Sequence, residues 1–179
     1  MSELTDKDTY RGNEVQFVLF ELEDEIYAVE IHKVIEILKM VNITPIPGAP
    51  DFIEGIINLR GKIVVVTDLK RRFNLKGERS GTHIIIVESG RNVFGVIVDD
   101  VLEVLRVVSD EIKEALSIIT EKIHTNYLNG VLILNDKLII LLNIDKIFSE
   151  EEMKELGGVE GKEKEKQETD TKEKILRKK

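Results

Sequence analysis

Short apolar runs rich in β-branched residues, each bounded by a polar turn, dominate the chain between residues 14 and 156. Such runs are typical of half-buried and fully buried β-strands. They form four pairs, and each pair predicts a hairpin: Val15–Leu22 with Ile26–Ile31, Ile56–Leu59 with Ile63–Thr67, Ile84–Val87 with Val93–Val98, and Val131–Leu134 with Leu138–Leu142. Four hairpins with little helix between them favour antiparallel barrels or a sandwich over a βαβ sheet.

Two short helices are predicted as well. Ser109 is a suitable N-cap, and acidic residues follow it where the first turn of a helix is positive. Ser149 and Glu152 have the spacing of a capping box, and Gly157 offers a stop. Neither helix carries a chemical motif.

The hairpins belong to an internal repeat. A shift of 67 residues overlays Phe17–Leu38 on Ile84–Leu105 without a gap, and a shift of 75 places Gly55, Leu59, Lys62 and Phe73 on Gly130, Leu134, Lys137 and Phe148. The two overlays predict two copies of one small β unit joined near residues 74–82. The expected limits are 14–78 for a first barrel, 79–148 for a second and 149–156 for a short C-terminal helix. The overlays leave open whether the barrels exchange strands.

The two ends of the chain differ from the body. Residues 1–13 are polar and are expected to be flexible, and residues 157–179 form a Lys/Glu tract that is expected to be disordered because it offers few apolar groups to bury. The first residues carry acids where a signal peptide would carry bases, and no apolar run approaches the length of a membrane span. The expected location is the cytoplasm.

The composition of the chain argues against several kinds of binding and catalytic site. The 179 residues have a formal charge of −8 and no cysteine, which argues against nucleic-acid binding, disulfide scaffolds and thiolate metal sites. The three histidines, His32, His83 and His124, lack metal-ligand spacing, and no nucleophile elbow or phosphate-binding loop is present. We therefore predict no catalytic residue, no metal and no cofactor.

Segment 45–68 is the most distinctive part of the chain. It holds all 3 prolines, within six residues, and it places Arg60-Gly61 at a predicted hairpin tip. An arginine there could present its planar fork of donors to a carboxylate or to backbone carbonyls of a partner. It could equally be a solvated turn residue, and the spacing alone does not decide between the two.

At this segment the sequence closely resembles the CheW family of bacterial chemotaxis coupling proteins. The family pattern P-x-F-I-x-G-I-x-N-L-R-G-x-I-V-P-V-x-D-L is matched by Pro50, Phe52, Ile53, Gly55, Asn58, Leu59, Arg60, Gly61, Ile63, Val64, Asp68 and Leu69. Supporting matches are Tyr27-Ala28-Val29, Val34-Ile35-Glu36-Ile37, Phe94-Gly95-Val96, Tyr127-Leu128 with Gly130, and Leu142-Asn143. The resemblance covers about residues 14–156. Val65 departs from it, because the family usually has proline there.

The resemblance implies a mainly β fold of two SH3-like five-stranded barrels and a protein without enzymatic activity. Its partners would be the cytoplasmic tip of methyl-accepting chemoreceptors, the regulatory domain of the histidine kinase CheA and, in rings, other copies of the chain. Such a protein is recruited to membrane-associated receptor arrays without inserting into the membrane itself.

The resemblance also implies site residues. The expected receptor contacts, in a groove between the barrels, are Ile31, Val34, Glu36, Arg60 and Ile84. The expected kinase contacts are Phe94, Gly95 and Val96, with the neighbouring hairpin Asn129–Lys137. His83 stands where the family tends to be apolar.

Three alternatives stay open. The chain could be a CheW-like coupling protein of a pilus-motility system or of another receptor–kinase array. It could also be a small-barrel protein that binds peptides or nucleic acid, although its charge argues against nucleic acid. The last alternative is an enzyme without a recognisable motif.

Overall fold

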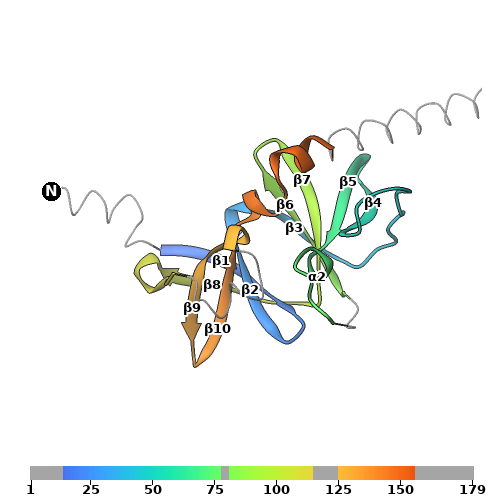
Figure 1. Cartoon of the computed structure of the whole chain (residues 1–179). Coiled ribbons are helices and arrows are strands. Elements are labelled where there is room, and N and C mark those ends of the chain that lie inside the picture. Colours follow the sequence, from blue (N-terminus) through green and yellow to red (C-terminus); the bar gives the residue numbers. More distant parts are fainter. Residues whose placement is uncertain (1–13, 78–80, 115–124, 156–179) are drawn as a thin grey trace, which may run out of the picture.

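The computed structural model describes residues 14–77, 81–114 and 125–155, and it consists mainly of β-strands (Figure 1). The strands are β1 (Glu14–Leu22), β2 (Glu25–Glu30), β3 (Val34–Lys39), β4 (Ile53–Leu59), β5 (Lys62–Asp68), β6 (His83–Ser89), β7 (Asn92–Val98), β8 (Asp100–Val108), β9 (Leu128–Leu134) and β10 (Lys137–Leu142). Short helical elements are α2 (Leu69–Arg72) and the 3-10 turns η1 (Ile31–Lys33), η2 (Ser109–Glu111), η3 (Thr125–Tyr127) and η4 (Ile144–Lys146).

The strands form two five-stranded sheets, which stand side by side in Figure 1. One sheet has the order β8-β1-β2-β10-β9 and the other has the order β3-β6-β7-β5-β4. All four predicted hairpins are confirmed, as the antiparallel pairs β1–β2, β4–β5, β6–β7 and β9–β10. The sheets form two SH3-like subdomains, so the predicted fold class is confirmed.

The subdomains divide the chain differently from the expected barrels, residues 14–78 and 79–148. The sheet β3-β6-β7-β5-β4 uses one unbroken stretch, residues 34–98, which we call the continuous subdomain. The other sheet combines residues 14–30 with 100–142, and we call it the discontinuous subdomain. The expected limits are therefore corrected: β3 pairs with β6 and β8 pairs with β1, so each of these strands leaves the subdomain of the hairpin before it.

The internal repeat is still recognisable in this arrangement of strands. A shift of 67 places β1, β2 and β3 on β6, β7 and β8, and a shift of 75 places β4 and β5 on β9 and β10. Each subdomain thus holds one example of every strand of the unit, but its strands come from both copies. Isolated bridges close the two sheets at equivalent places, Thr44 with Ile56 and Lys113 with Val131. The copies have exchanged strands.

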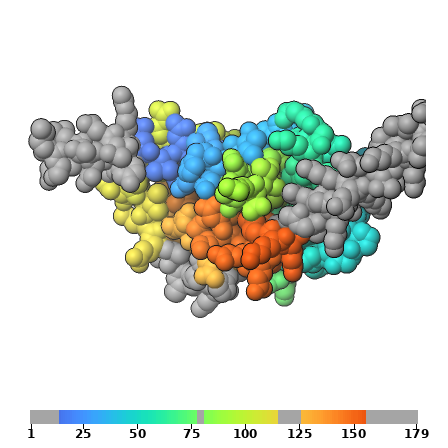
Figure 2. All heavy atoms as spheres, turned by 90° about the horizontal axis from the view of Figure 1, so that it is seen from above, coloured from blue at the N-terminus to red at the C-terminus, as the bar shows by residue number. Residues whose placement is uncertain are grey.

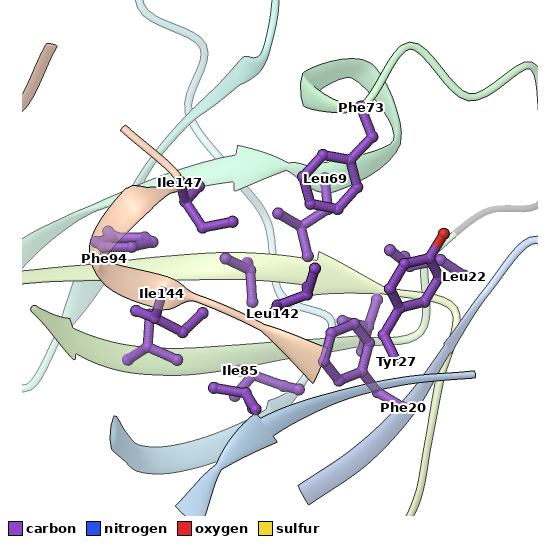
Figure 3. Packing of buried hydrophobic residues seen from close by; sticks show 14 of the residues in the cluster. Phe20, Leu22, Tyr27, Leu69, Phe73, Ile85, Phe94, Leu142, Ile144 and Ile147 are labelled. Atoms are coloured by element: carbon purple, nitrogen blue, oxygen red, sulfur yellow. The ribbon is translucent and has the colours of Figure 1, made fainter. Parts of the chain in front are cut away.

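The inner strands are buried on both faces, because each sheet packs on its own interior and against the other sheet. Along β1, Phe17 and Leu19 point into the interior of the discontinuous subdomain, whereas Phe20 belongs to a cluster that both subdomains share. Figure 3 shows this shared cluster, in which Phe20 lies beside Tyr27, and Leu142 and Ile144 lie between these rings and Phe94 of the continuous subdomain. The shared core holds the two subdomains together through the hydrophobic effect.

Of the two predicted helices, one forms and the other does not. Ser149 and Glu152 form the capping box, in which the Ser149 amide donates to Oε1 of Glu152 and the Glu152 amide donates to Oγ of Ser149, at 2.8 and 3.1 Å. Residues 150–155 are helical, which confirms this prediction. The helix expected at Ser109 is wrong, since only the three-residue η2 forms there and its N-cap is Val108. The expected flexible N-terminus and charged tail lie outside the described residues.

Candidate functional site

Arg60 lies where the sequence predicts it, at the tip of the β4–β5 hairpin. Arg60 and Gly61 have positive φ angles of 52° and 84°, the conformation that a two-residue hairpin turn needs. The side chain of Asn58 accepts a hydrogen bond from the Gly61 amide at 2.8 Å, which fixes the turn. The Asn-Leu-Arg-Gly segment is therefore a local turn that places Arg60 at the tip of the hairpin.

The guanidinium of Arg60 binds a carboxylate of its own chain. Its two terminal nitrogens donate to the two oxygens of Glu36 in β3, at 3.2 and 2.8 Å. The arginine side chain is 75% exposed and the glutamate side chain is 20% exposed. The pair joins β3 to the β4–β5 turn, and β3 and β4 are the two ends of this sheet. The sequence left open whether Arg60 binds a partner or is a solvated turn residue. Neither description is complete, because the guanidinium binds a carboxylate of its own chain and is still accessible to a partner.

Two apolar residues of the expected receptor site lie along the same stretch of chain. Ile31 belongs to η1 and is exposed, whereas Val34 opens β3 and packs partly against the shared core. Because η1 runs directly into β3, Ile31, Val34 and Glu36 follow one another along one edge of the continuous subdomain. The structure therefore brings four of the five expected receptor residues, these three and Arg60, to one edge.

Four expected contact residues are buried instead. Ile84 is completely buried inside the continuous subdomain, and Gly95 packs against it. Phe94 and Val96 belong to the shared core. As partner contacts these assignments are corrected, because β6 and β7 lie inside the sheet and both of their faces are covered. The hairpin Asn129–Lys137, by contrast, lies at the end of its sheet and is partly exposed.

The large apolar side chains that remain exposed in the described chain gather on three segments. They are Ile31, Ile35, Ile37, Met40 and Val41 on η1, β3 and the residues after it; Leu102, Val104 and Val108 on β8; and Ile133 and Leu138 on the β9–β10 hairpin. We call the first two groups the β3 row and the β8 row. Exposed apolar patches of this kind mark surfaces that bind other proteins.

Sequence reasoning missed these rows because it did not recognise β3 and β8 as strands. A signal was present, however. In the overlay at a shift of 67, Ile35 falls on Leu102 and Ile37 falls on Val104, so large apolar residues recur at equivalent positions. β3 and β8 also stand at equivalent ends of their sheets. The rows are therefore a repeated feature of the unit.

The described residues offer little for catalysis. Among residues 14–77, 81–114 and 125–155, no group of three or more His, Asp or Glu side chains is arranged to hold a metal ion. His32 makes an exposed contact of 3.2 Å with Glu30, and His83 receives or donates one bond with Thr82. No helix in the described part of the chain has the length and apolar character of a membrane span.

Comparisons with known proteins agree with this geometry. The model of the CheW-like domain matches residues 16–152. The chain is 37% identical to chemotaxis protein CheW of Klebsiella aerogenes over 77% of this chain and 84% of that protein, and 32% identical to chemotaxis protein CheW of Thermotoga maritima over 79% and 93%. It also resembles the crystal structure of the scaffolding protein TtCheW of Thermoanaerobacter tengcongensis, with a TM-score of 0.70, 40% identity and coverage of 75% of this chain and 88% of the other.

Proposed function

The chain belongs to the CheW family of chemotaxis coupling proteins, and from this premise we propose that it is a non-catalytic adaptor between chemoreceptors and the kinase CheA. It would work in the cytoplasm, within receptor arrays at the membrane, and would act by binding alone. The observation that carries the proposal is the set of exposed apolar rows on the described part of the fold. A protein with several separate binding surfaces suits a coupling role.

The receptor site in this proposal is the edge formed by Ile31, Val34, Glu36 and Arg60. A receptor helix offers apolar residues at helical spacing and charged residues beside them. Ile31 and Val34 would supply the apolar contact, and the exposed Arg60–Glu36 pair would supply a charged rim that fixes orientation. Ile84 has no part in it, since its side chain lies inside the subdomain.

The kinase contacts in this proposal are the β3 row without Ile31, which belongs to the receptor site, and the β8 row, together with Ile133 on the β9–β10 hairpin. Two equivalent surfaces on one chain allow each copy to join a neighbour on either side, as a ring of alternating proteins requires. The regulatory domain of CheA and other copies of this chain are the expected neighbours. These exposed residues replace the buried Phe94, Gly95 and Val96.

The test is a titration of this chain against the isolated regulatory domain of its cognate CheA, followed by calorimetry. We expect one-to-one binding with a dissociation constant in the micromolar range or below. Ile35→Glu and Leu102→Glu change equivalent positions of the two rows, so comparing them shows which row the kinase uses. Lys154→Glu is the control, because Lys154 is an exposed polar residue outside both rows.

The possible results separate the claims. A tenfold loss of affinity for one row variant, with Lys154→Glu unchanged, supports the assignment of that row. Unchanged affinity for both row variants would contradict the surface but not the coupling role. No binding at about 100 µM, with both proteins folded, would point to a kinase of a pilus-motility system or another array.

A further inference from the structure

The chain passes between the two subdomains twice. It leaves β2 and enters β3 through η1, and it leaves β7 and enters β8 through the single residue Asp99. These crossings are equivalent in the repeat, because a shift of 67 places His32 of η1 on Asp99. Each crossing is held by an ion pair to a residue that follows the fifth strand of a repeat copy, β5 or β10.

The crossing at Asp99 is buried. Its carboxylate binds Nζ of Lys70 at 2.6 Å, and the same nitrogen binds Glu23 at 2.9 Å. The side chain of Lys70 is 8% exposed and that of Asp99 is 0% exposed. The Asp99 amide also donates to the carbonyl of Glu21 at 2.9 Å. Breaking such a pair leaves an uncompensated charge in a dry site, which is strongly unfavourable.

The crossing at η1 is exposed. Nζ of Lys33 binds both oxygens of Asp145 at 3.0 Å, and Oγ of Ser89 donates to Asp145 at 2.8 Å. The two charged side chains are 26% and 47% exposed, and η1 contains no buried residue. In Figure 2 the blue, green and orange parts of the chain that carry these elements meet in the middle of the face shown. Ion pairs in such surroundings contribute little to stability.

The two clusters stand at equivalent places in the repeat and carry reversed charge, although Lys33 and Asp99 differ by one position in the overlay. Asp68 and Asn143 are equivalent N-caps, and each accepts a bond from the amide two residues later, at 2.9 and 3.1 Å. Those later residues are Lys70 and Asp145, a cation in one copy and an anion in the other. Burial alone would lower the pKa of Lys70, but the bonds to Asp99 and Glu23 raise it above its usual value. Burial alone would raise the pKa of Asp145, but Ser89 and Lys33 hold it below its usual value.

We propose that η1 is a releasable hinge: separation of Lys33 from Asp145 frees this crossing and the start of β3, while the Lys70–Asp99 cluster keeps the other crossing closed. The shared core holds both sheets in place, and Val34 packs partly against it, so the motion is centred on residues 31–33 and reaches no further than Val34. If the proposed function holds, this hinge carries Ile31 and Val34 and would adjust how they meet a receptor. The hinge itself is a property of the chain without a partner.

Amide hydrogen exchange of the whole chain tests the hinge, because each crossing carries a matched probe. The Val34 amide donates to the carbonyl of Ile31, and the Asp99 amide donates to that of Glu21. We expect Val34 to exchange at least tenfold faster than Asp99 in the unaltered protein. Lys33→Ala should accelerate Val34 about fivefold and leave Asp99 unchanged. The exchanged pair Lys33→Asp with Asp145→Lys should restore the original rate.

Two results would overturn the hinge. One is equal protection of the Val34 and Asp99 amides from exchange in the unaltered protein. This measurement does not depend on whether any variant folds. The other is a loss of protection at both probes in Lys33→Ala, since that would show one rigid junction. No partner is present in these measurements, so the hinge and the proposed coupling role can fail independently of each other.

Discussion

The two subdomains are built from the same unit, yet of the equivalent hairpins β4–β5 and β9–β10 only β4–β5, in the continuous subdomain, carries an arginine at its tip. Arg60 corresponds to Asn135 in the β9–β10 turn, and Glu36 corresponds to Glu103 in β8. The turn residues have nearly equal φ angles, 52° for Arg60 and 50° for Asn135. Because the discontinuous subdomain forms the same sheet without such an arginine, the Arg60–Glu36 pair is not a requirement of the fold. The comparison separates what the unit needs to fold from what one copy adds at its surface.

The largest effect is expected when the subdomains are separated. Residues 34–98 contain all five strands of the continuous subdomain, but Val65, Phe94 and Val96 on those strands belong to the shared core. In isolation these side chains would face water, so we expect the fragment 34–98 to lack a cooperative unfolding transition. Circular dichroism during heating checks this. A sharp transition near that of the whole chain would show that the continuous subdomain is stable without its neighbour.

The next largest effect is expected at two equivalent glycines, one in each subdomain. Gly55 and Gly130 have φ angles of +154° and +144°, and a Cβ at either position would strike the carbonyl oxygen of Thr44 or Lys113, respectively. These are the residues whose bridges close the sheets. We expect Gly55→Ala and Gly130→Ala each to lower the free energy of unfolding by about 2–4 kcal/mol.

Urea denaturation measures both variants, and the position of the disturbance distinguishes them. Gly55→Ala should shift amide resonances mainly in the continuous subdomain, and Gly130→Ala mainly in the discontinuous one. Gly61→Ala is a useful control, because Gly61 also has a positive φ of 84° but no atom stands within 4 Å of the added Cβ. If Gly130→Ala lowers the free energy of unfolding no more than Gly61→Ala does, the two sheets are not closed in equivalent ways.

A smaller effect on stability, but a clear one on binding, is expected from Arg60→Asn. The change gives this hairpin the residue found at the equivalent place in the other subdomain, and asparagine tolerates a positive φ. We expect Tm to fall by less than about 3 °C, because the lost ion pair is largely exposed. Binding to a chemoreceptor cytoplasmic fragment should weaken at least tenfold.

Sedimentation of the protein with receptor-containing membranes measures this binding. Asn135→Gly, at the equivalent turn of the other subdomain, is the matched control and should leave receptor binding unchanged. If Arg60→Asn binds the receptor as well as the unaltered chain, the arginine is not part of the receptor site.

The smallest effect is expected from removing residues 160–179. This tract is rich in Lys and Glu and poor in apolar residues, so we expect it to add nothing to the kinase contact. Calorimetry with the CheA regulatory domain should give the same affinity with and without it. A tenfold loss of affinity would place the tract in the interface. Kinase binding would then not be a property of the two subdomains alone.

Local features of this protein were predictable because they depend on neighbours in the sequence. Alternating and β-branched runs predicted the four hairpins, and Arg60-Gly61 predicted a tight turn with positive φ. The capping box at Ser149 was also found in advance. Of the residues expected at the receptor site, Ile31, Val34, Glu36 and Arg60 lie together at one edge, and their role stays a prediction, whereas Ile84 is buried.

The failures share one cause. Phe94 and Val96 were taken for contacts because a strand buried on both faces has the same sequence pattern as one with an exposed apolar face. β3 and β8 were missed as strands because their outward residues are apolar, which hides the alternation that marks a sheet edge. A buried apolar strand and an apolar edge strand can be told apart only by the residues that pack around them in the folded protein.

The sequence by itself determined the hairpins, the turns, the duplication and the family, because each is encoded in the order of nearby residues or in a repeated motif. The tertiary structure alone decided how the two copies share their strands. It placed β3 on β6 and β8 on β1, and it set Lys70 against Asp99 and Lys33 against Asp145. Pairing between distant strands depends on which arrangement buries the most apolar surface from both copies at once, and no local pattern specifies that choice.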